Sequence, residues 1–198
     1  MSSSEISPTA KVASNSVLGL GVRVWDFSQL REGCSIGENS IIGRNVYIGP
    51  GVMIGANCKI QNNSLIYEPA ILENGVFVGP DVVLTNDQYP RAINPNGALK
   101  SSIDWNPVGV TIKEGASIGA KSVCVAPIVI GAWALVAAGS TVVKDVSDYS
   151  LVAGNPAKQI GWVGRAGQPL KKIMENQYQC PLTSEMYELL PNGNLVRK

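Results

Sequence analysis

The chain has 198 residues, of which 45% are hydrophobic, and its 16 Lys and Arg nearly balance 15 Asp and Glu. This composition is typical of one sizeable globular domain, and a net charge of +1 does not favour nucleic acid as a partner. The chain contains no His, which excludes His-ligated zinc and an imidazole base. Its four Cys lack a CxxC spacing, so we expect no metal and a reducing, cytoplasmic location.

The first ten residues, MSSSEISPTA, have neither a basic start nor an apolar core, so we expect no secretory signal. No apolar run approaches the roughly 18 residues that a membrane-spanning helix needs.

From Ile6 onward, an aliphatic residue recurs at every sixth position. These anchors are Ile6, Val12, Leu18, Val24, Leu30, Ile36, Ile42, Ile48, Ile54, Ile60, Ile66, Leu72, Val78 and Leu84. A second run in a shifted frame comprises Ile112, Ile118, Cys124, Ile130, Val136 and Val142. The residue two places before an anchor is usually small or β-branched, and Gly often follows the anchor, as at Gly37.

A period of six matches neither an α-helix nor the irregular strand spacing of an ordinary β-sandwich. It fits short strands joined by corners, with three hexapeptides to a coil and with each anchor and the small residue before it pointing inward. We expect the Gly after an anchor to supply tight corners with positive φ. Because one coil cannot bury its own apolar face, coils must stack, and the repeat predicts an all-β parallel β-helix.

Equivalent positions of successive coils, three hexapeptides apart, then form vertical columns on the outside of the predicted prism. One outward column reads Gln29, Tyr47, Leu65 and Val83, and a second reads Val17, Ser35, Met53 and Ile71. Both are apolar in the middle coils, which favours burial of two faces against neighbours in a homotrimer. Scattered apolar surface residues are the alternative.

The repeat stops after Leu84 and resumes at Ile112, which predicts a long loop near residues 85–108. Loops of this length in compact domains are usually functional or disordered. Stacking of the coils places Glu68 one coil below Asn86, with Asp87 beside them. Two carboxylates and an amide suit an amine ligand, whereas each residue alone would fit an ordinary solvated corner.

After Val146 the pattern changes, so we divide the chain into a β-helix domain, residues 1–146, and a C-terminal extension, residues 147–198. The stretch QPLKKIMENQY predicts a short helix, and PNGN at residues 191–194 predicts the tight turn of a small hairpin.

The hexapeptides, together with GNPAK at residues 154–158, resemble the hexapeptide-repeat acyltransferases, whose parallel β-helix is left-handed. Residues 75–92, GVFVGPDVVLTNDQYPRA, are similar to the bacterial nucleotide-3-amino-sugar N-acetyltransferases. Residues 180–189, CPLTSEMYEL, are similar to the ending of the branch that acetylates UDP-2-acetamido-3-amino-2,3-dideoxyglucuronate for O-antigen sugars. That branch usually has Gly where Glu185 stands.

The resemblance implies acetyl-CoA as co-substrate, bound in the groove between neighbouring subunits of a homotrimer. The residues expected to contact it are Gly119, Ala120, Ala137, Ala138, Gly139, Asn155, Pro156 and Lys158. The expected catalytic residues are Asn86, Asp87 and Glu68, with Asn86 accepting a hydrogen bond from the sugar amine. Candidates for binding the nucleotide sugar are Arg31, Tyr67, Thr85, Tyr89 and Arg91.

Three other functions stay open. The acceptor could be a dTDP-3-amino-3,6-dideoxyhexose instead of the UDP-sugar. O-acetyl transfer ranks lower, because a hydroxyl needs a base more than an amine does and the chain has no His. A non-catalytic β-helix scaffold ranks third, since it would not need the GNPAK terminus or the acidic corner.

Overall fold

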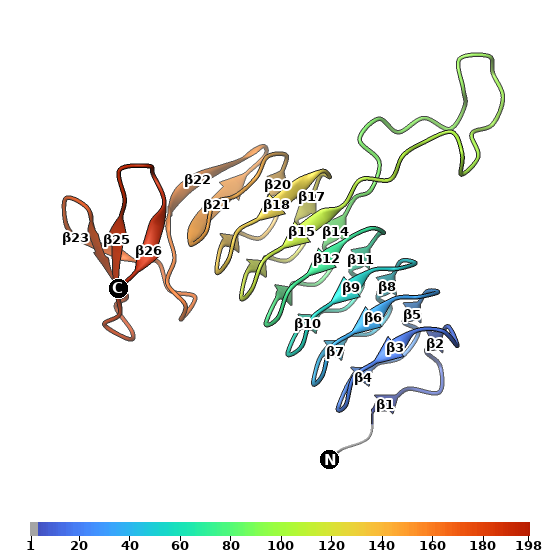
Figure 1. The fold of residues 1–198 in the computed structure, drawn as a ribbon, viewed down its shortest axis with the longest axis horizontal. Coiled ribbons are helices and arrows are strands. Elements are labelled where there is room, and N and C mark those ends of the chain that lie inside the picture. Colours follow the sequence, from blue (N-terminus) through green and yellow to red (C-terminus); the bar gives the residue numbers. More distant parts are fainter. Residues whose placement is uncertain (1–3) are drawn as a thin grey trace.

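The computed structural model describes residues 4–198 and has two parts: a three-sided prism of stacked coils and a small antiparallel sheet beyond its C-terminal end (Figure 1). One loop leaves the prism about midway along it (Figure 1). Within residues 4–198, no helix is long and apolar enough to cross a membrane.

Three sheets form the sides of the prism. Sheet A has the order β1 (Glu5–Ile6), β4 (Arg23–Val24), β7 (Ile41–Ile42), β10 (Lys59–Ile60), β13 (Phe77–Val78), β16 (Ser117–Ile118), β19 (Leu135–Val136), β21 (Ser150–Gly154) and β22 (Ala157–Trp162). Sheet B comprises β2 (Lys11–Val12), β5 (Gln29–Leu30), β8 (Tyr47–Ile48), β11 (Leu65–Ile66), β14 (Val83–Leu84), β17 (Val123–Cys124) and β20 (Thr141–Val142). Sheet C comprises β3 (Val17–Leu18), β6 (Ser35–Ile36), β9 (Met53–Ile54), β12 (Ile71–Leu72), β15 (Val110–Ile112) and β18 (Ile128–Ile130).

The strands of consecutive coils pair in parallel with a register of three hexapeptides. In sheet B, for example, Tyr47 pairs with Leu65 and Leu65 pairs with Val83. At the interruption Val83 pairs with Val123, so the loop lengthens a single coil without disturbing the stack. The predicted parallel β-helix of hexapeptide repeats is confirmed.

The aliphatic anchors fill the inside of the prism, as predicted, and form one continuous core from Val22 to Val152. Serines two places before an anchor join successive coils. Ser40 Oγ donates to the Gly55 carbonyl at 2.9 Å and accepts from the Cys58 N–H at 2.9 Å. Ser28 and Ser64 make the same bond to the carbonyls of Gly43 and Gly79. The small inward positions thus supply both space and hydrogen bonds.

Glycines that follow the anchors have a different role from the one expected. The left-handed φ values lie two residues further on, as at Asn39 with φ of 59°. Gly37 is needed for close approach instead, because a Cβ there would collide with the backbone of Gly55 and Ala56 in the next coil. The prediction of positive φ after the anchor was therefore wrong.

The predicted C-terminal helix was also wrong, whereas the hairpin is confirmed. Residues 171–197 form a four-stranded antiparallel sheet, β23 (Lys171–Met174), β24 (Gln177–Gln179), β25 (Met186–Leu189) and β26 (Leu195–Arg197). The stretch expected to be helical spans β23 and β24, which pair with each other. The PNGN turn joins β25 to β26, and Gly193 there has φ of 83°.

Aromatic contacts hold this C-terminal sheet against the last coils. The Arg165 guanidinium lies 4.6 Å from the centre of the Trp133 ring, and the Tyr149 and Tyr187 rings meet edge to face at 5.3 Å. The buried Tyr187 hydroxyl accepts from the Arg165 N–H and donates to Glu185. Glu185 thus helps to hold the C-terminal sheet against the last coils, and its carboxylate also forms an ion pair with Arg197.

Replacing Ser40 by Ala should lower the free energy of unfolding by about 1–3 kcal/mol, because the Gly55 carbonyl and the Cys58 N–H lose their partner in a dry core. Urea unfolding at one fixed protein concentration measures this. The exposed Ser102→Ala is the matched control, with an expected change within about 0.5 kcal/mol. Equal stability of the two variants would contradict the role assigned to the serine ladder.

Burial raises the pKa of the Cys124 thiol to about 12. Since the thiolate is the reactive form, Cys124 should resist iodoacetamide at pH 8 in the folded protein and react once the protein is unfolded in urea. Mass spectrometry of the labelled peptides measures this. Rapid labelling of Cys124 in the native state would show that the core opens to solvent.

Candidate active site

The loop leaves the prism at Asn86, two residues after the end of β14, and returns at Val108, two residues before β15 begins. The Val108 N–H donates to the Asn86 carbonyl at 3.0 Å, which closes the root of the loop. Further out, the Lys100 N–H donates to the Ala92 carbonyl at 3.0 Å. Two arms, residues 86–92 and 100–108, are therefore joined at both ends, and residues 93–99 form a turn beyond them.

Glu68 lies one coil below Asn86 in the corner between sheets B and C. The register of β11 and β14 sets this position, because Ile66 pairs with Leu84. Thr85, between β14 and Asn86, uses its hydroxyl oxygen to accept from the Ala126 N–H at 3.0 Å. That bond fastens the loop root to the coil above.

The Glu68 carboxylate carries an unusual feature. Within residues 4–198, its Oε2 atom is buried and has no hydrogen-bond partner. The atom lies in the space that a side chain at Gly49 would fill. A buried oxygen without a donor is costly, so this corner favours a ligand that brings an N–H or O–H group.

An aromatic and cationic group lies beside Glu68. The Tyr47 and Tyr67 rings contact each other at 5.3 Å, and Arg31 donates to the Tyr47 hydroxyl at 3.4 Å while pairing with Glu32 at 2.9 Å. Burial raises the pKa of Tyr47, and the negative charge of Glu68 raises it further. Sequence reasoning did not single out Tyr47, although its place in the outward column above Gln29 was already recognised.

Asp87 and Tyr89 line a cavity of about 320 Å³ between the two arms of the loop. Asp87 Oδ1 accepts from the Tyr89 N–H at 2.9 Å. Arg91 does not line this cavity, and its guanidinium donates to the neighbouring Pro90 carbonyl. The cavity adds a set of residues that sequence analysis missed: Lys100, Asp104, Trp105 and Asn106.

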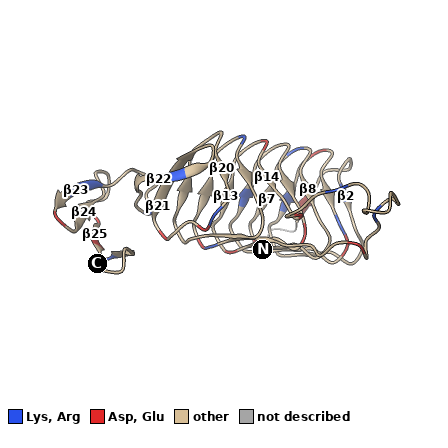
Figure 2. Ribbon diagram, turned by 90° about the horizontal axis from the view of Figure 1, so that it is seen from above, with Lys and Arg blue, Asp and Glu red and all other residues tan. Residues whose placement is uncertain are grey.

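The residues expected to contact acetyl-CoA meet at another corner, between sheets A and B, at the C-terminal end of the prism. Gly119 and Ala120 lie one coil below Ala137, Ala138 and Gly139. Asn155 and Pro156 form the turn between the antiparallel strands β21 and β22, and the Gly154 N–H donates to Ser140 Oγ at 3.2 Å. Lys158 follows on β22 and is exposed. Figure 2 shows β22, part of it coloured blue, at the C-terminal end of the prism.

The two sets of residues do not meet within one chain. The set around Asn86 follows the strands of sheet B, whereas the set around Gly139 precedes them, so sheet B lies between.

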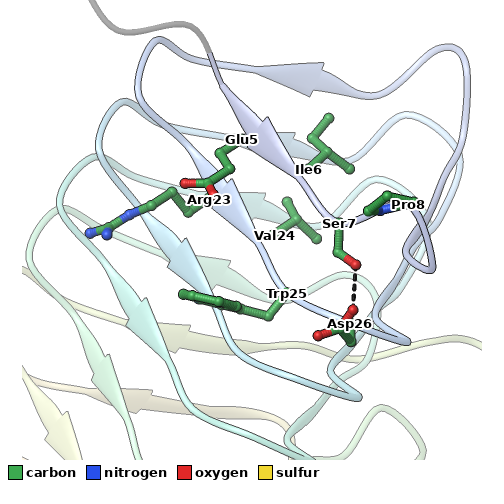
Figure 3. Close-up of a pocket in the computed structure, with 8 residues that line it drawn as sticks. All are labelled: Glu5, Ile6, Ser7, Pro8, Arg23, Val24, Trp25 and Asp26. Atoms are coloured by element: carbon green, nitrogen blue, oxygen red, sulfur yellow. Dashed lines mark hydrogen bonds between the residues drawn. The ribbon is translucent and has the colours of Figure 1, made fainter.

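A second hollow, of about 210 Å³, lies at the N-terminal end between the first two coils (Figure 3). The half-exposed Trp25 forms part of its wall. Asp26 accepts from Ser7 at 2.5 Å and from Thr9 at 2.9 Å, and these bonds lower the pKa of its carboxyl group. Its carboxylate is thus engaged in joining coils, and the hollow contains none of the predicted site residues.

Known proteins share this repeat. A model of the bacterial transferase hexapeptide (six repeats) matches residues 15–50, 33–68 and 51–86, and a model of the hexapeptide repeat of succinyl-transferase matches residues 109–144. The dTDP-3-amino-3,6-dideoxy-alpha-D-galactopyranose 3-N-acetyltransferase of Aneurinibacillus thermoaerophilus is 51% identical over 69 residues. That match spans 35% of this chain and 35% of the relative.

Two solved structures share the fold at low sequence identity. LpxA, a UDP-N-acetylglucosamine acyltransferase from Bacteroides fragilis 9343, gives a TM-score of 0.66 at 18% identity, over 81% of this chain and 62% of that one. The acetyltransferase domain of PglB from Neisseria gonorrhoeae FA1090, in complex with acetyl coenzyme A, gives a TM-score of 0.53 at 19% identity. That match covers 79% of this chain and 57% of the PglB chain. The matched repeats cover more than half of the chain, which therefore belongs to the hexapeptide-repeat left-handed β-helix acyltransferase superfamily.

Proposed function

We propose that this protein is an acetyl-CoA-dependent N-acetyltransferase that acts on the 3-amino group of a nucleotide-linked sugar. The observation that carries the proposal is the corner in which Glu68 lies one coil below Asn86, together with the buried Glu68 Oε2 that has no hydrogen-bond partner among residues 4–198. An amine is the ligand that supplies such a corner with N–H donors. The relative from Aneurinibacillus thermoaerophilus, named for acting on a dTDP-3-amino sugar, supports this reaction class.

The same relative favours a dTDP-3-amino-3,6-dideoxyhexose over the UDP-glucuronate derivative expected from the C-terminal motif. The motif itself has a structural explanation in this chain. Its Tyr187 and Glu185 hold the C-terminal sheet to the coils, far along the chain from the loop root. Its residues therefore carry little information about the acceptor sugar.

In the proposed reaction, the neutral sugar amine attacks the acetyl carbonyl carbon, the new C–N bond forms, and the C–S bond of the thioester breaks. Asn86 accepts a hydrogen bond from the amine and directs its lone pair, while Glu68 holds the other N–H. The proton lost by nitrogen passes to the departing CoA sulfur. The protein's main contribution is then positioning, because a sugar amine needs little activation near neutral pH.

Acetyl-CoA would lie along the corner formed by Gly119, Ala120 and Ala137–Gly139, where the side chains are small and Ala138 and Gly139 are exposed. Lys158 would face the phosphates of the cofactor. Because sheet B separates this corner from Asn86, the site needs the acceptor corner of one subunit and the cofactor corner of another. The exposed apolar residues Val17, Met53 and Ile71 on sheet C suit burial in the corresponding homotrimer.

Asn86→Ala should lower the rate of thiol release from acetyl-CoA about 100-fold, because the amine loses its positioning partner. The assay uses dTDP-3-amino-3,6-dideoxygalactose and UDP-2-acetamido-3-amino-2,3-dideoxyglucuronate as acceptors. The exposed Asn176→Ala, on the C-terminal sheet, is the matched control and should keep wild-type activity. Release with neither sugar by the wild type, or full activity of Asn86→Ala, would reject the proposal.

Mixing two inactive variants tests the shared site. Asn86→Ala lacks the acceptor corner, and Ala138→Trp blocks the cofactor corner with a bulky ring at an exposed position. Co-expression should restore about one quarter of wild-type activity, since random assortment pairs the two intact corners in about one site in four. No restoration in mixed oligomers, verified by two affinity tags, would mean that each chain forms its own site.

A further inference from the structure

The loop contains a pocket of its own, distinct from the acetyl-transfer corner. Its two arms are tied at the root by Val108 to Asn86 and at the outer end by Lys100 to Ala92. The cavity of about 320 Å³ lies between these ties. A loop serving only as a spacer would not need two arms held apart around a space within the size range of small-molecule sites.

The lining of this loop pocket combines flat aromatic and polar groups. Tyr89 comes from the outgoing arm and the half-buried Trp105 from the returning arm. Asp87 and Gln88 face the cavity from one arm, and Lys100 and Asn106 from the other. Aromatic rings offer stacking to a planar ligand, and the amides and carboxylates offer hydrogen bonds to its edge.

We propose that the loop pocket binds the nucleobase end of a nucleoside diphosphate, with the base stacked on Trp105. This inference rests on the proposed function, in which the acceptor sugar is nucleotide-linked. It assigns Trp105, Asn106 and Gln88 as residues that select the acceptor's nucleotide.

Charge favours the base over the diphosphate inside the pocket. Asp87 and Asp104 supply two carboxylates against the single ammonium of Lys100. Hydrogen bonds from the Ser101 N–H and hydroxyl, both 2.7 Å, lower the pKa of Asp104 and keep it ionised at neutral pH. A diphosphate would be repelled by this pair, whereas a neutral base with N–H donors would not.

The position of the pocket also fits the acetyl-transfer corner. Asp87 lines the pocket and directly follows Asn86 at the loop root. A base between the arms would thus leave its diphosphate and sugar to extend toward Glu68 and Asn86. The loop would then position the sugar amine by binding the nucleobase at the opposite end of the nucleotide sugar.

Isothermal titration of the CoA-saturated protein with UDP, dTDP and GDP tests this inference. For the nucleotide that binds most tightly, Trp105→Ala should raise the Kd about 5- to 150-fold, the loss expected for one stacked base. Trp105→Phe should keep most of the affinity. Trp25→Ala, in the N-terminal hollow, is the matched control and should bind like the wild type.

Binding of none of the three nucleotides by the wild type would overturn the inference, and so would an unchanged Kd in Trp105→Ala. An equal loss in Trp25→Ala would also overturn it. Nucleotide binding that depends on Trp105, without any thiol release in the acetyl-transfer assay, would reject the proposed reaction and leave the nucleotide pocket standing. Thiol release in the acetyl-transfer assay, combined with an unchanged Kd in Trp105→Ala, would support the proposed reaction and reject the nucleotide pocket.

Discussion

The backbone hydrogen bonds between successive coils are the constraint on which the rest of this structure depends. They hold the coils so close that Gly37 has no room for a Cβ, and they fix the register at three hexapeptides. Every outward position is thereby aligned with its equivalents above and below. The column in which a residue lies therefore determines its neighbours. In this way Glu68 and Asn86, which are distant in sequence, come to share one corner.

This regularity also explains why reactive groups gather at irregular points. The flat sides of the prism offer shallow surfaces, and a coil wall of Gly and Ala can only support an extended ligand. The deeper cavity lies within the long loop between β14 and β15. The proposed enzyme thus divides its work: uniform coils hold the thioester, and one irregular loop recognises the acceptor.

The repeat made the fold predictable, because few structures other than a β-helix have a period of six residues. The strand register then follows from the three hexapeptides in each coil. The C-terminal extension had no such constraint. KKIM and the residues after it are a short run whose apolar spacing suits a helix or a strand. Pairing of β23 with β24, and of β24 with β25, decided the outcome. The loop pocket was out of reach for a related reason. Trp105 and Tyr89 line one cavity because backbone hydrogen bonds of Val108 and Lys100 join the two arms of the loop, and no local sequence pattern predicts those bonds.

The antiparallel return of β22 along β21 has a consequence for the stack as a whole. A parallel β-helix ends in open strand edges, to which another coil of like direction could add. Reversing the chain at Gly154 gives sheet A an outermost strand of opposite polarity, and the C-terminal sheet follows it. The C-terminal edge of sheet A is therefore closed to the addition of a further parallel coil.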